Sequence, residues 1–156
     1  MEYIRSAKEE DKGGCFLCPH GTSASDEEVL VLARMPSAFM IMNKYPYSNG
    51  HVMVVPNRHT GFIEDLTDHE LLDMMSLVRI ISVVLKETLN AEGLNIGVNM
   101  GKAAGAGLED HIHIHVVPRW FGDTNFMPVV GDTKVISEYL HETYSRLKES
   151  IGAKIF

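Results

Sequence analysis

Residues 111–119 read His-Ile-His-Ile-His-Val-Val-Pro-Arg, so histidines alternate with apolar β-branched residues at a period of two. This alternation predicts a β-strand over residues 111–117, because successive side chains of a strand point to opposite faces. One face of that strand would carry His111, His113 and His115. The fold must therefore contain a sheet with a row of imidazoles on one side. A solvated, histidine-rich face is the simplest alternative interpretation.

Three histidines on one strand do not make one metal site. At a rise of about 3.3 Å per residue, the backbones of His111 and His115 would lie roughly 13 Å apart. Zinc holds nitrogen ligands at about 2.0–2.1 Å, so one ion could bind two neighbours of the row but not all three. At least one imidazole is then available for other chemistry. We favour a division of roles in which one histidine attacks covalently and another binds the charged group under attack.

The remaining periodicity predicts one α+β domain, with a mostly antiparallel five-stranded sheet, one long helix and a C-terminal helix. Apolar and β-branched runs predict the other strands at residues 28–33, 38–42, 51–55 and 94–100. Asn49-Gly50 predicts a hairpin turn between the second and third strands. We expect a closing helix at about 133–149, and a flexible arm at 1–14 before a single domain at 15–156.

A capping-box pattern, Thr67 followed by Glu70, predicts the start of the long helix. The helix is expected to run to about Asn90, with Gly93 as the residue that stops it. Its apolar residues recur at helical spacing, and we expect them in the core: Leu71, Leu72, Met75, Val78, Ile81, Leu85 and Leu89.

Charge and hydropathy exclude some classes of function. The chain has 156 residues, 45% of them hydrophobic, and a formal net charge of −7. A protein that binds nucleic acid along its phosphate backbone needs a basic surface, which this composition disfavours. No apolar run approaches the length of a membrane span, and the first residues lack the apolar region of a signal peptide. We therefore expect a cytoplasmic protein whose partners are small molecules rather than nucleic acid or membrane.

Both cysteines fall in one motif, Cys15-Phe-Leu-Cys18, after Gly13-Gly14 and before Pro19. A thioredoxin-like pair would open a helix after a strand, whereas this context is typical of a zinc knuckle. Two thiolates are only half of a tetrahedral structural zinc site. His20 is a candidate third ligand because it is close in sequence. A reduced pair without a metal is the alternative interpretation.

The run from His111 to Val117 resembles the histidine triad motif, His-x-His-x-His-x-x with apolar x. Residues 43–56, from Asn43 to Pro56, resemble the first nucleotide-binding segment of that family. Two further stretches, 99–107 and 118–128, also match, and the second is similar to the branch that contains bacterial diadenosine tetraphosphate phosphorylases. The resemblance covers roughly residues 13–150, and it implies a HIT-like fold.

The resemblance implies a nucleotidyl hydrolase or transferase that acts on the α-phosphate of adenosine polyphosphates. His113 would be the nucleophile, and AMP bound to it would pass to water or to inorganic phosphate. His51 and His115 would bind the non-bridging phosphate oxygens. Asn43 takes the place of a ribose-binding residue, although an ordinary turn role for it is equally open, and Asn99 would lie beside the phosphates.

The glycine-rich stretch before the triad is a candidate phosphate-binding loop. Backbone N–H groups of Gly105, Ala106 and Gly107 could approach a phosphate closely, although a glycine-rich hairpin loop is a simpler explanation. Better-known branches carry Gln and Ser or Thr shortly before the first histidine, where this chain has Gly107 and Leu108. Backbone amides would then replace side-chain contacts to the leaving group.

The resemblance also completes the metal site. Zinc-containing members use the histidine of the Pro-x-x-His pattern and the first histidine of the triad, which here are His59 and His111. The implied structural zinc ligands are therefore Cys15, Cys18, His59 and His111, and we rank His59 above His20. The resemblance further implies a homodimer or a higher homo-oligomer.

Three classes of function remain open at this stage. The first is the nucleotidyl enzyme, as a diadenosine tetraphosphate phosphorylase, a hydrolase or a purine nucleoside phosphoramidase; phosphorylase-like members carry Gln where this chain has Ile114. The second is a zinc-dependent hydrolase that uses His111 and His113 as ligands. The third is a nucleotide-binding protein without turnover.

Overall fold

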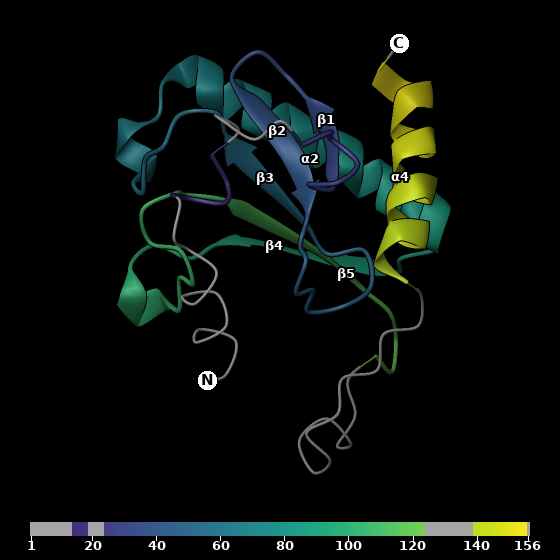
Figure 1. The fold of residues 1–156 in the computed structure, drawn as a ribbon. Helices are drawn as coiled ribbons and strands as arrows, with labels where there is room; N and C mark the ends of the chain where they lie inside the picture. The colour runs from purple at the N-terminus through teal and green to yellow at the C-terminus, as the bar shows by residue number, and fades with distance from the viewer. Residues whose placement is uncertain (1–13, 19–23, 124–138, 156) are drawn as a thin grey trace.

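The protein folds into an antiparallel sheet with one long helix packed across a face and a second helix beside it (Figure 1). The computed structural model describes residues 14–18, 24–123 and 139–155. Its strands are β1 (Val31–Arg34), β2 (Ala38–Met42), β3 (Val52–Pro56), β4 (Gly93–Val98) and β5 (Ile114–Arg119). Its helices are α2 (Asp68–Leu89) and α4 (Leu140–Ile155), with short 3₁₀ turns η1 (Ile63–Asp65) and η2 (Lys102–Ala104).

The five strands form one sheet in the order β1-β2-β3-β5-β4, and every neighbouring pair is antiparallel. Strand β5 lies between β3 and β4, so His115 pairs with Met53 on one side and with Gly97 on the other. The predicted α+β class and the mostly antiparallel five-stranded sheet are confirmed.

Strand β2 has the predicted boundaries and β3 is shifted by one residue, whereas larger differences occur in β1, β4 and β5. The first strand begins at Val31 rather than at 28, because residues 26–30 form turns and Leu30 has a positive φ of 62°. The fourth strand ends at Val98 rather than at 100. The fifth begins at Ile114 and ends at Arg119, so the prediction of a strand over 111–117 was wrong for residues 111–113.

The connection between β2 and β3 is longer than the two-residue hairpin turn that Asn49-Gly50 suggested. Residues 43–51 join the two strands, and the turn closes with a hydrogen bond from His51 N–H to the Ser48 carbonyl. Gly50 has a φ of 77°, which favours glycine. A Cβ at this position would also lie 2.4 Å from a methyl carbon of Leu89.

Helix α2 begins where the capping box predicts. The Thr67 side chain accepts from the Glu70 N–H, and the Glu70 carboxylate accepts from the Thr67 N–H. The helix ends at Leu89 because Asn90 adopts a left-handed conformation with a φ of 54°, a common C-terminal cap. Gly93 opens β4 instead, so the prediction that it stops the helix was wrong.

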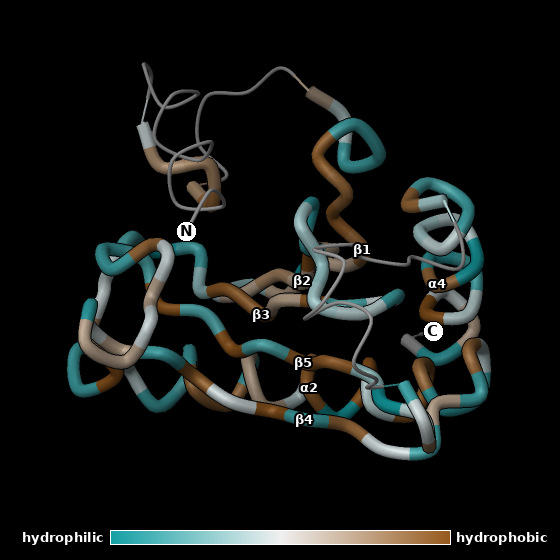
Figure 2. Tube along the Cα trace, turned by 90° about the horizontal axis from the view of Figure 1, so that it is seen from below, coloured by the Kyte–Doolittle hydropathy of each residue, from teal (hydrophilic) through white to brown (hydrophobic). Residues whose placement is uncertain are grey.

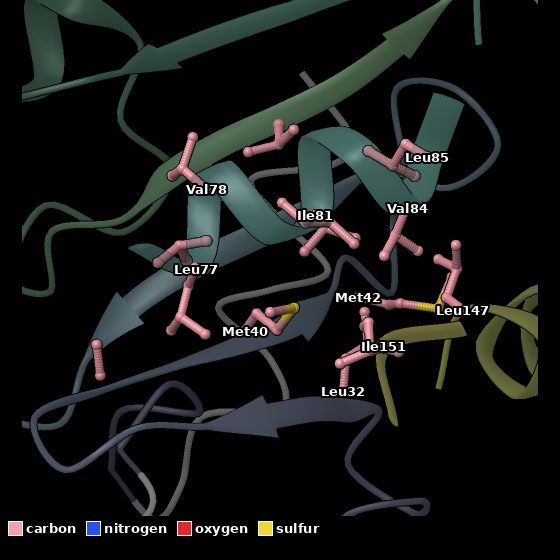
Figure 3. Close-up of a cluster of buried hydrophobic side chains, with 14 of the residues drawn as sticks. Leu32, Met40, Met42, Leu77, Val78, Ile81, Val84, Leu85, Leu147 and Ile151 are labelled. Carbon is pink, nitrogen blue, oxygen red and sulfur yellow. The ribbon is translucent and has the colours of Figure 1, made fainter. Parts of the chain in front are cut away.

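The main core lies between α2, α4 and the inner face of the sheet (Figure 3). Leu77, Ile81 and Leu85 of α2 pack against Met40 and Met42 of β2, together with Leu147 and Ile151 of α4. Two residues of the predicted stripe point outward instead, since Leu72 and Met75 are exposed. The buried face of the helix consists of Glu70, Met74, Leu77, Val78, Ile81, Val84 and Leu85.

A second, smaller cluster covers part of the opposite face of the sheet. It joins Leu17 to Phe39, Met53 and Val55. In Figure 2 the described segment 14–18 and helix α2 lie on opposite sides of the sheet. Segment 14–18 therefore lies on the side of the sheet that carries His115, because Leu17 packs against Met53 and Met53 pairs in register with His115.

Two predicted segments fall partly outside the described residues. Of the predicted arm at 1–14, only Gly14 is described. The predicted C-terminal helix at 133–149 is described from Tyr139 onward; Tyr139 is not helical, and helix α4 runs from Leu140 to Ile155, beyond the predicted end. Among the helices of the described residues, none combines the length and the apolarity that crossing a membrane requires.

Candidate active site

The side chains of residues 111–116 alternate between the two faces of the sheet, although β5 begins only at Ile114. Ile112 and Val116 are buried in the cluster under α2, and Ile114 packs against it. His111, His113 and His115 therefore project to the opposite face of the sheet. A hydrogen bond from the Ile112 N–H to the Thr60 carbonyl, at 2.7 Å, holds the stretch before β5.

His113 is buried, and one of its ring nitrogens has a fixed role. Its Nδ1 lies 2.9 Å from the His111 carbonyl oxygen. Since a carbonyl can only accept, Nδ1 carries the proton and Nε2 carries the lone pair. Burial lowers the pKa of His113, which favours the neutral ring. The arrangement provides a neutral imidazole with its nucleophilic nitrogen directed away from the backbone.

His115 lies beside His113 and in contact with His51. The rings of His113 and His115 meet edge-to-face with centroids 4.7 Å apart. His115 Nδ1 is 2.9 Å from His51 Nε2. Burial, and secondly the neighbouring His113, lower the pKa of His115 to about 4, so His115 is neutral at pH 7 and has a single N–H to donate.

His51 directly precedes β3 and is fully buried. Besides His115, its ring meets the Tyr47 backbone N–H, which donates to Nδ1 at 3.1 Å. The Tyr47 ring stacks on it with centroids 4.8 Å apart and planes 24° apart. Our prediction gave His51 a direct bond to phosphate oxygens, whereas in the structure its two nitrogens face His115 and the 43–51 loop.

The predicted nucleotide-binding residues occupy two loops. Asn43 is buried beside His51, and its Oδ1 accepts from the Tyr45 N–H. Asn99 is half-buried and directly follows β4. The end of β4 pairs with the start of β5, Val98 with Ile114, so the 99–113 loop leaves and rejoins the sheet at the end where His113 lies.

Two backbone N–H groups of the glycine-rich loop donate hydrogen bonds to carbonyls of the same loop. The Gly105 N–H donates to the Lys102 carbonyl, and the Ala106 N–H donates to the Gly101 carbonyl. For Gly107, the described residues offer its N–H no hydrogen-bond acceptor. Among the three residues predicted to bind phosphate through the backbone, Gly107 is therefore the one with an amide available to an anion in this conformation.

The predicted metal ligands converge from three separate segments of the chain. One ligand atom from each of Cys15, Cys18, His59 and His111 lies within 4.8 Å of the others. His111 Nδ1 is 3.4 Å from Cys15 Sγ and 3.6 Å from Cys18 Sγ, and His59 Nδ1 is 3.2 Å from Cys18 Sγ. His20, the rival ligand, lies outside the described residues.

These side chains suit a tetrahedral metal. With Zn–S bonds of about 2.3 Å and Zn–N bonds of about 2.0–2.1 Å, tetrahedral angles separate sulfur and nitrogen by about 3.6 Å. His111 Nε2 donates to the Pro56 carbonyl at 2.9 Å, which leaves a lone pair on Nδ1 toward the cysteines. Burial raises the pKa of the Cys15 thiol to about 11, so a thiolate here needs a cation beside it. The cluster can hold a metal ion.

Two contacts of this site were missed by the sequence analysis. Tyr47 lies inside segment 43–56, which resembles a nucleotide-binding segment, but no sequence pattern indicates that its ring stacks on His51. Gly61 is equally unmarked, although a Cβ there would lie 2.4 Å from the Glu109 carbonyl oxygen. Its position two residues after His59 was the available signal, because a ligand-bearing turn that passes close to another backbone favours glycine.

An antiparallel sheet, a helix packed across one face and a row of histidines on the opposite face together define a protein of the histidine triad class. The HIT domain family matches residues 25–122, and this chain belongs to the HIT family. The predicted resemblance is thereby confirmed. Among solved structures, the Zn-bound histidine triad family protein from Mycobacterium smegmatis is similar, with a TM-score of 0.67, 27% identity, and coverage of 80% of this chain and 85% of that chain.

Two similar proteins are named as enzymes. AP-4-A phosphorylase of Mycobacterium tuberculosis (strain CDC 1551 / Oshkosh) is 45% identical over 119 residues, which are 76% of this chain and 61% of that protein. Bis(5'-adenosyl)-triphosphatase of Dictyostelium discoideum is 38% identical over 82 residues, 53% of this chain and 54% of that protein. The chain thus spans about three fifths or less of the length of these relatives.

Proposed function

We propose that this protein is a nucleotidyl transferase or hydrolase that acts on the α-phosphate of diadenosine polyphosphates, through AMP bound covalently to His113. The observation that carries this proposal is the hydrogen bond from His113 Nδ1–H to the His111 carbonyl, which leaves a lone pair on Nε2. The names of the relatives, AP-4-A phosphorylase and bis(5'-adenosyl)-triphosphatase, support the class of substrate.

In the first step, His113 Nε2 attacks the α-phosphorus. A P–N bond forms, the bond to the bridging oxygen breaks, and the remaining nucleoside polyphosphate leaves with the electron pair of that bond. His115 would donate its N–H to a non-bridging oxygen, where charge builds in the transition state. In the second step, water or inorganic phosphate attacks the same phosphorus, the P–N bond breaks, and His113 returns as a neutral imidazole.

Covalent trapping tests the role of His113. Brief incubation with radiolabelled diadenosine tetraphosphate, followed by denaturation at alkaline pH, should leave AMP on the unsubstituted protein and none on His113→Ala. His141→Ala is the matched control, because His141 is exposed on α4. Label retained by His113→Ala, at the level of the control, would refute His113 as the nucleophile.

The acceptor is inferred to be inorganic phosphate, since the 45% identical relative is named a phosphorylase. Phosphorolysis of diadenosine tetraphosphate gives ADP and ATP, and requires phosphate. Asymmetrical hydrolysis gives AMP and ATP without phosphate. Product analysis with and without phosphate separates the two, and an adenosine phosphoramidate assayed in parallel tests the phosphoramidase alternative. AMP as the main product in the presence of phosphate would contradict phosphorolysis.

We propose that the Cys15, Cys18, His59 and His111 cluster holds a structural zinc ion. Four protein ligands close a tetrahedral site, and such an ion supplies cross-linking rather than an activated water. The cluster would tie segment 14–18 to the turn at His59 and to the first triad histidine. The zinc-hydrolase alternative needs His111 and His113 on one metal, but both ring nitrogens of His111 face other groups: Nδ1 faces Cys15 and Cys18, and Nε2 donates to the Pro56 carbonyl. Metal loss in His113→Ala would favour that alternative.

Cys15→Ser tests the zinc proposal. Protein purified without chelators should contain about one zinc per chain, measured by elemental analysis, and Cys15→Ser should contain much less. Because the cluster anchors a segment rather than the nucleophile, thermal stability should fall more than the single-turnover rate at His113. Unsubstituted protein without any bound metal would refute the proposal. We also propose a cytoplasmic location and assembly into a homodimer or a higher homo-oligomer.

A further inference from the structure

The histidine half of the Cys15, Cys18, His59 and His111 cluster is held in place by the fold itself. The segments that carry His59 and His111 are joined by a hydrogen bond from the Ile112 N–H to the Thr60 carbonyl, at 2.7 Å. His111 Nε2 also donates to a backbone carbonyl of β3. The His59 and His111 rings meet edge-to-face with centroids 5.1 Å apart. These contacts involve neither cysteine.

The cysteine half is attached through side chains. Residues 15–18 form a turn, closed by a hydrogen bond from the Cys18 N–H to the Cys15 carbonyl at 2.9 Å. Among the described residues, the backbone of this turn forms no hydrogen bond with the sheet. Its attachments are the two sulfurs, which face the histidines, and the buried side chain of Leu17, which packs against Met53.

The two sulfurs are also close to each other. Both are free thiols, and their Sγ atoms lie within 4.8 Å. A turn of four residues brings its outer Cα atoms within about 7 Å, and natural disulfides join Cα atoms about 4.4–6.8 Å apart. Small side-chain rotations in Cys15 and Cys18 therefore suffice to join them. Both side chains are half-buried, so a small oxidant can reach them.

We propose that Cys15 and Cys18 are also a redox site, at which a peroxide converts the metal-binding pair into a disulfide and detaches residues 15–18 from the sheet. The two thiolate sulfurs lose two electrons and an S–S bond forms. Hydrogen peroxide takes up these electrons with two protons from solvent and leaves as two water molecules. The inference rests on the proposed zinc site, because it takes the two sulfurs as ligands.

Oxidation separates the two halves of the cluster. A thiolate is a metal ligand and a disulfide sulfur is not, so only two of the four ligands would remain and the ion would be released. His59 and His111 keep their backbone contacts, so the sheet and the histidine row stay folded. The turn loses its sulfur attachments, and Leu17 no longer stays on the sheet. Its departure exposes apolar side chains of β2 and β3, among them Phe39 and Val55.

Titration of the zinc-loaded protein with hydrogen peroxide tests the inference. We expect zinc release, followed with a colorimetric chelator, in step with the loss of both alkylatable thiols, followed by mass spectrometry. A dye that fluoresces on apolar surfaces should bind the oxidised protein more strongly. Dithiothreitol followed by added zinc should reverse all three changes. Zinc retained after peroxide treatment, or zinc released without a disulfide, would overturn the inference.

Oxidation of methionine is the main competing reaction, since the chain contains nine methionines. Methionine sulfoxide is restored by dedicated reductases rather than by dithiothreitol, so recovery with dithiothreitol assigns the change to the cysteines. The double variant Cys15→His/Cys18→His offers four nitrogen ligands and no thiol, and its zinc should withstand peroxide. If this variant fails to hold zinc, the recovery of the unsubstituted protein still decides.

The zinc proposal and this inference fail on different measurements. Zinc content before peroxide treatment tests the first, whereas the disulfide and the dye signal test the second. If the purified protein contained no metal, the zinc proposal would be refuted. Peroxide would then still have to couple Cys15 to Cys18 and raise the dye signal, and protein whose two thiols both stayed alkylatable would overturn the redox site.

Discussion

The triad histidines carry the same side chain, and the partner of one ring nitrogen distinguishes each of them. His111 donates to the Pro56 carbonyl and turns its other nitrogen to the cysteines. His113 donates to the His111 carbonyl and keeps a lone pair for attack. The Nδ1 atom of His115 lies within hydrogen-bond distance of Nε2 of His51. Backbone carbonyls therefore distinguish the proposed metal ligand, His111, from the proposed nucleophile, His113, two residues away.

At the residue scale, the first prediction concerns His115. His115→Ala removes one donor to the phosphate, and losing one such donor typically slows the chemical step about 10²–10³-fold. Nucleotide binding should remain measurable, and the zinc content should not change, because His115 is not part of the Cys15 cluster. Single-turnover rates, equilibrium binding and elemental analysis check the three parts. A rate equal to that of the unsubstituted protein would mean that His115 does not contact the reacting phosphate.

A second residue-scale prediction concerns Glu70. The Arg58 guanidinium donates to this buried carboxylate from Nε at 3.0 Å and from Nη2 at 2.9 Å. Chiefly because of Arg58, and also through the Thr67 N–H and hydroxyl, the pKa of Glu70 is lowered from 4.5 to about 2. A depressed carboxyl pKa stabilises the fold above the unfolded value, and this contribution is lost as the pH falls from about 4.5 to about 2.

Glu70→Gln should therefore lower the free energy of unfolding at pH 7 by about 1–3 kcal/mol, the usual cost of a lost cap and a charge-assisted hydrogen bond. It should also flatten the fall in stability below about pH 4.5. Urea denaturation at pH 7 and at pH 3 measures both effects. Glu64→Gln, an exposed position on η1, is the control. Equal pH dependence in the two variants would contradict the assignment.

At the scale of elements, local patterns predicted the long helix well and the strand ends less well. The Thr67 capping box is a contact between neighbours in sequence, so its residues alone indicate where α2 begins. The start of β5 depends on its partners instead: β3 and β4 pair with β5 from Ile114 onward, and His111 and His113 precede that pairing. Periodicity reports which side a residue faces, not where a partner strand stops.

The turn after His59 is the subject of the element-scale prediction. A Cβ on Gly61 would lie 2.4 Å from the Glu109 carbonyl oxygen, and neither partner is the end of a flexible side chain. Gly61→Ala should force apart the two segments that carry His59 and His111, at a cost of about 1–3 kcal/mol for an overpacked contact. Thermal denaturation should register the loss, together with weaker zinc retention.

Gly152→Ala provides the matched control for Gly61→Ala. Gly152 lies inside α4 and is exposed, and a Cβ there would have no heavy atom within 4 Å. Because alanine is favoured over glycine in a helix by about 1 kcal/mol, this variant should be slightly stabilised. If both alanine variants unfolded at the same temperature as the unsubstituted protein, the close approach at Gly61 would be wrong.

At the scale of the whole molecule, the metal cluster and the His51–His115 pair could not be found from local sequence patterns. Cys15 and His111 are 96 residues apart in sequence, and His51 and His115 are 64 apart. Only the resemblance to a family connected the cysteines with His59 and His111. The tautomers depend on backbone groups of Tyr47 and His111, which no side-chain pattern encodes.

The last prediction concerns assembly. The outer face of α2 exposes Leu72, Met75 and Val83, which lie three to eleven residues apart and share one side of the helix. Strand β4 is an edge of the sheet and exposes Ile96. Exposed edges and apolar helix faces favour association, and a two-fold axis would let both surfaces pair with their own copies. We therefore expect a homodimer or a larger closed assembly at micromolar concentration, measured by light scattering. Met75→Glu should weaken it by burying a charge, while Glu64→Lys, at an exposed position on η1, should not. A monomeric unsubstituted protein would contradict this prediction.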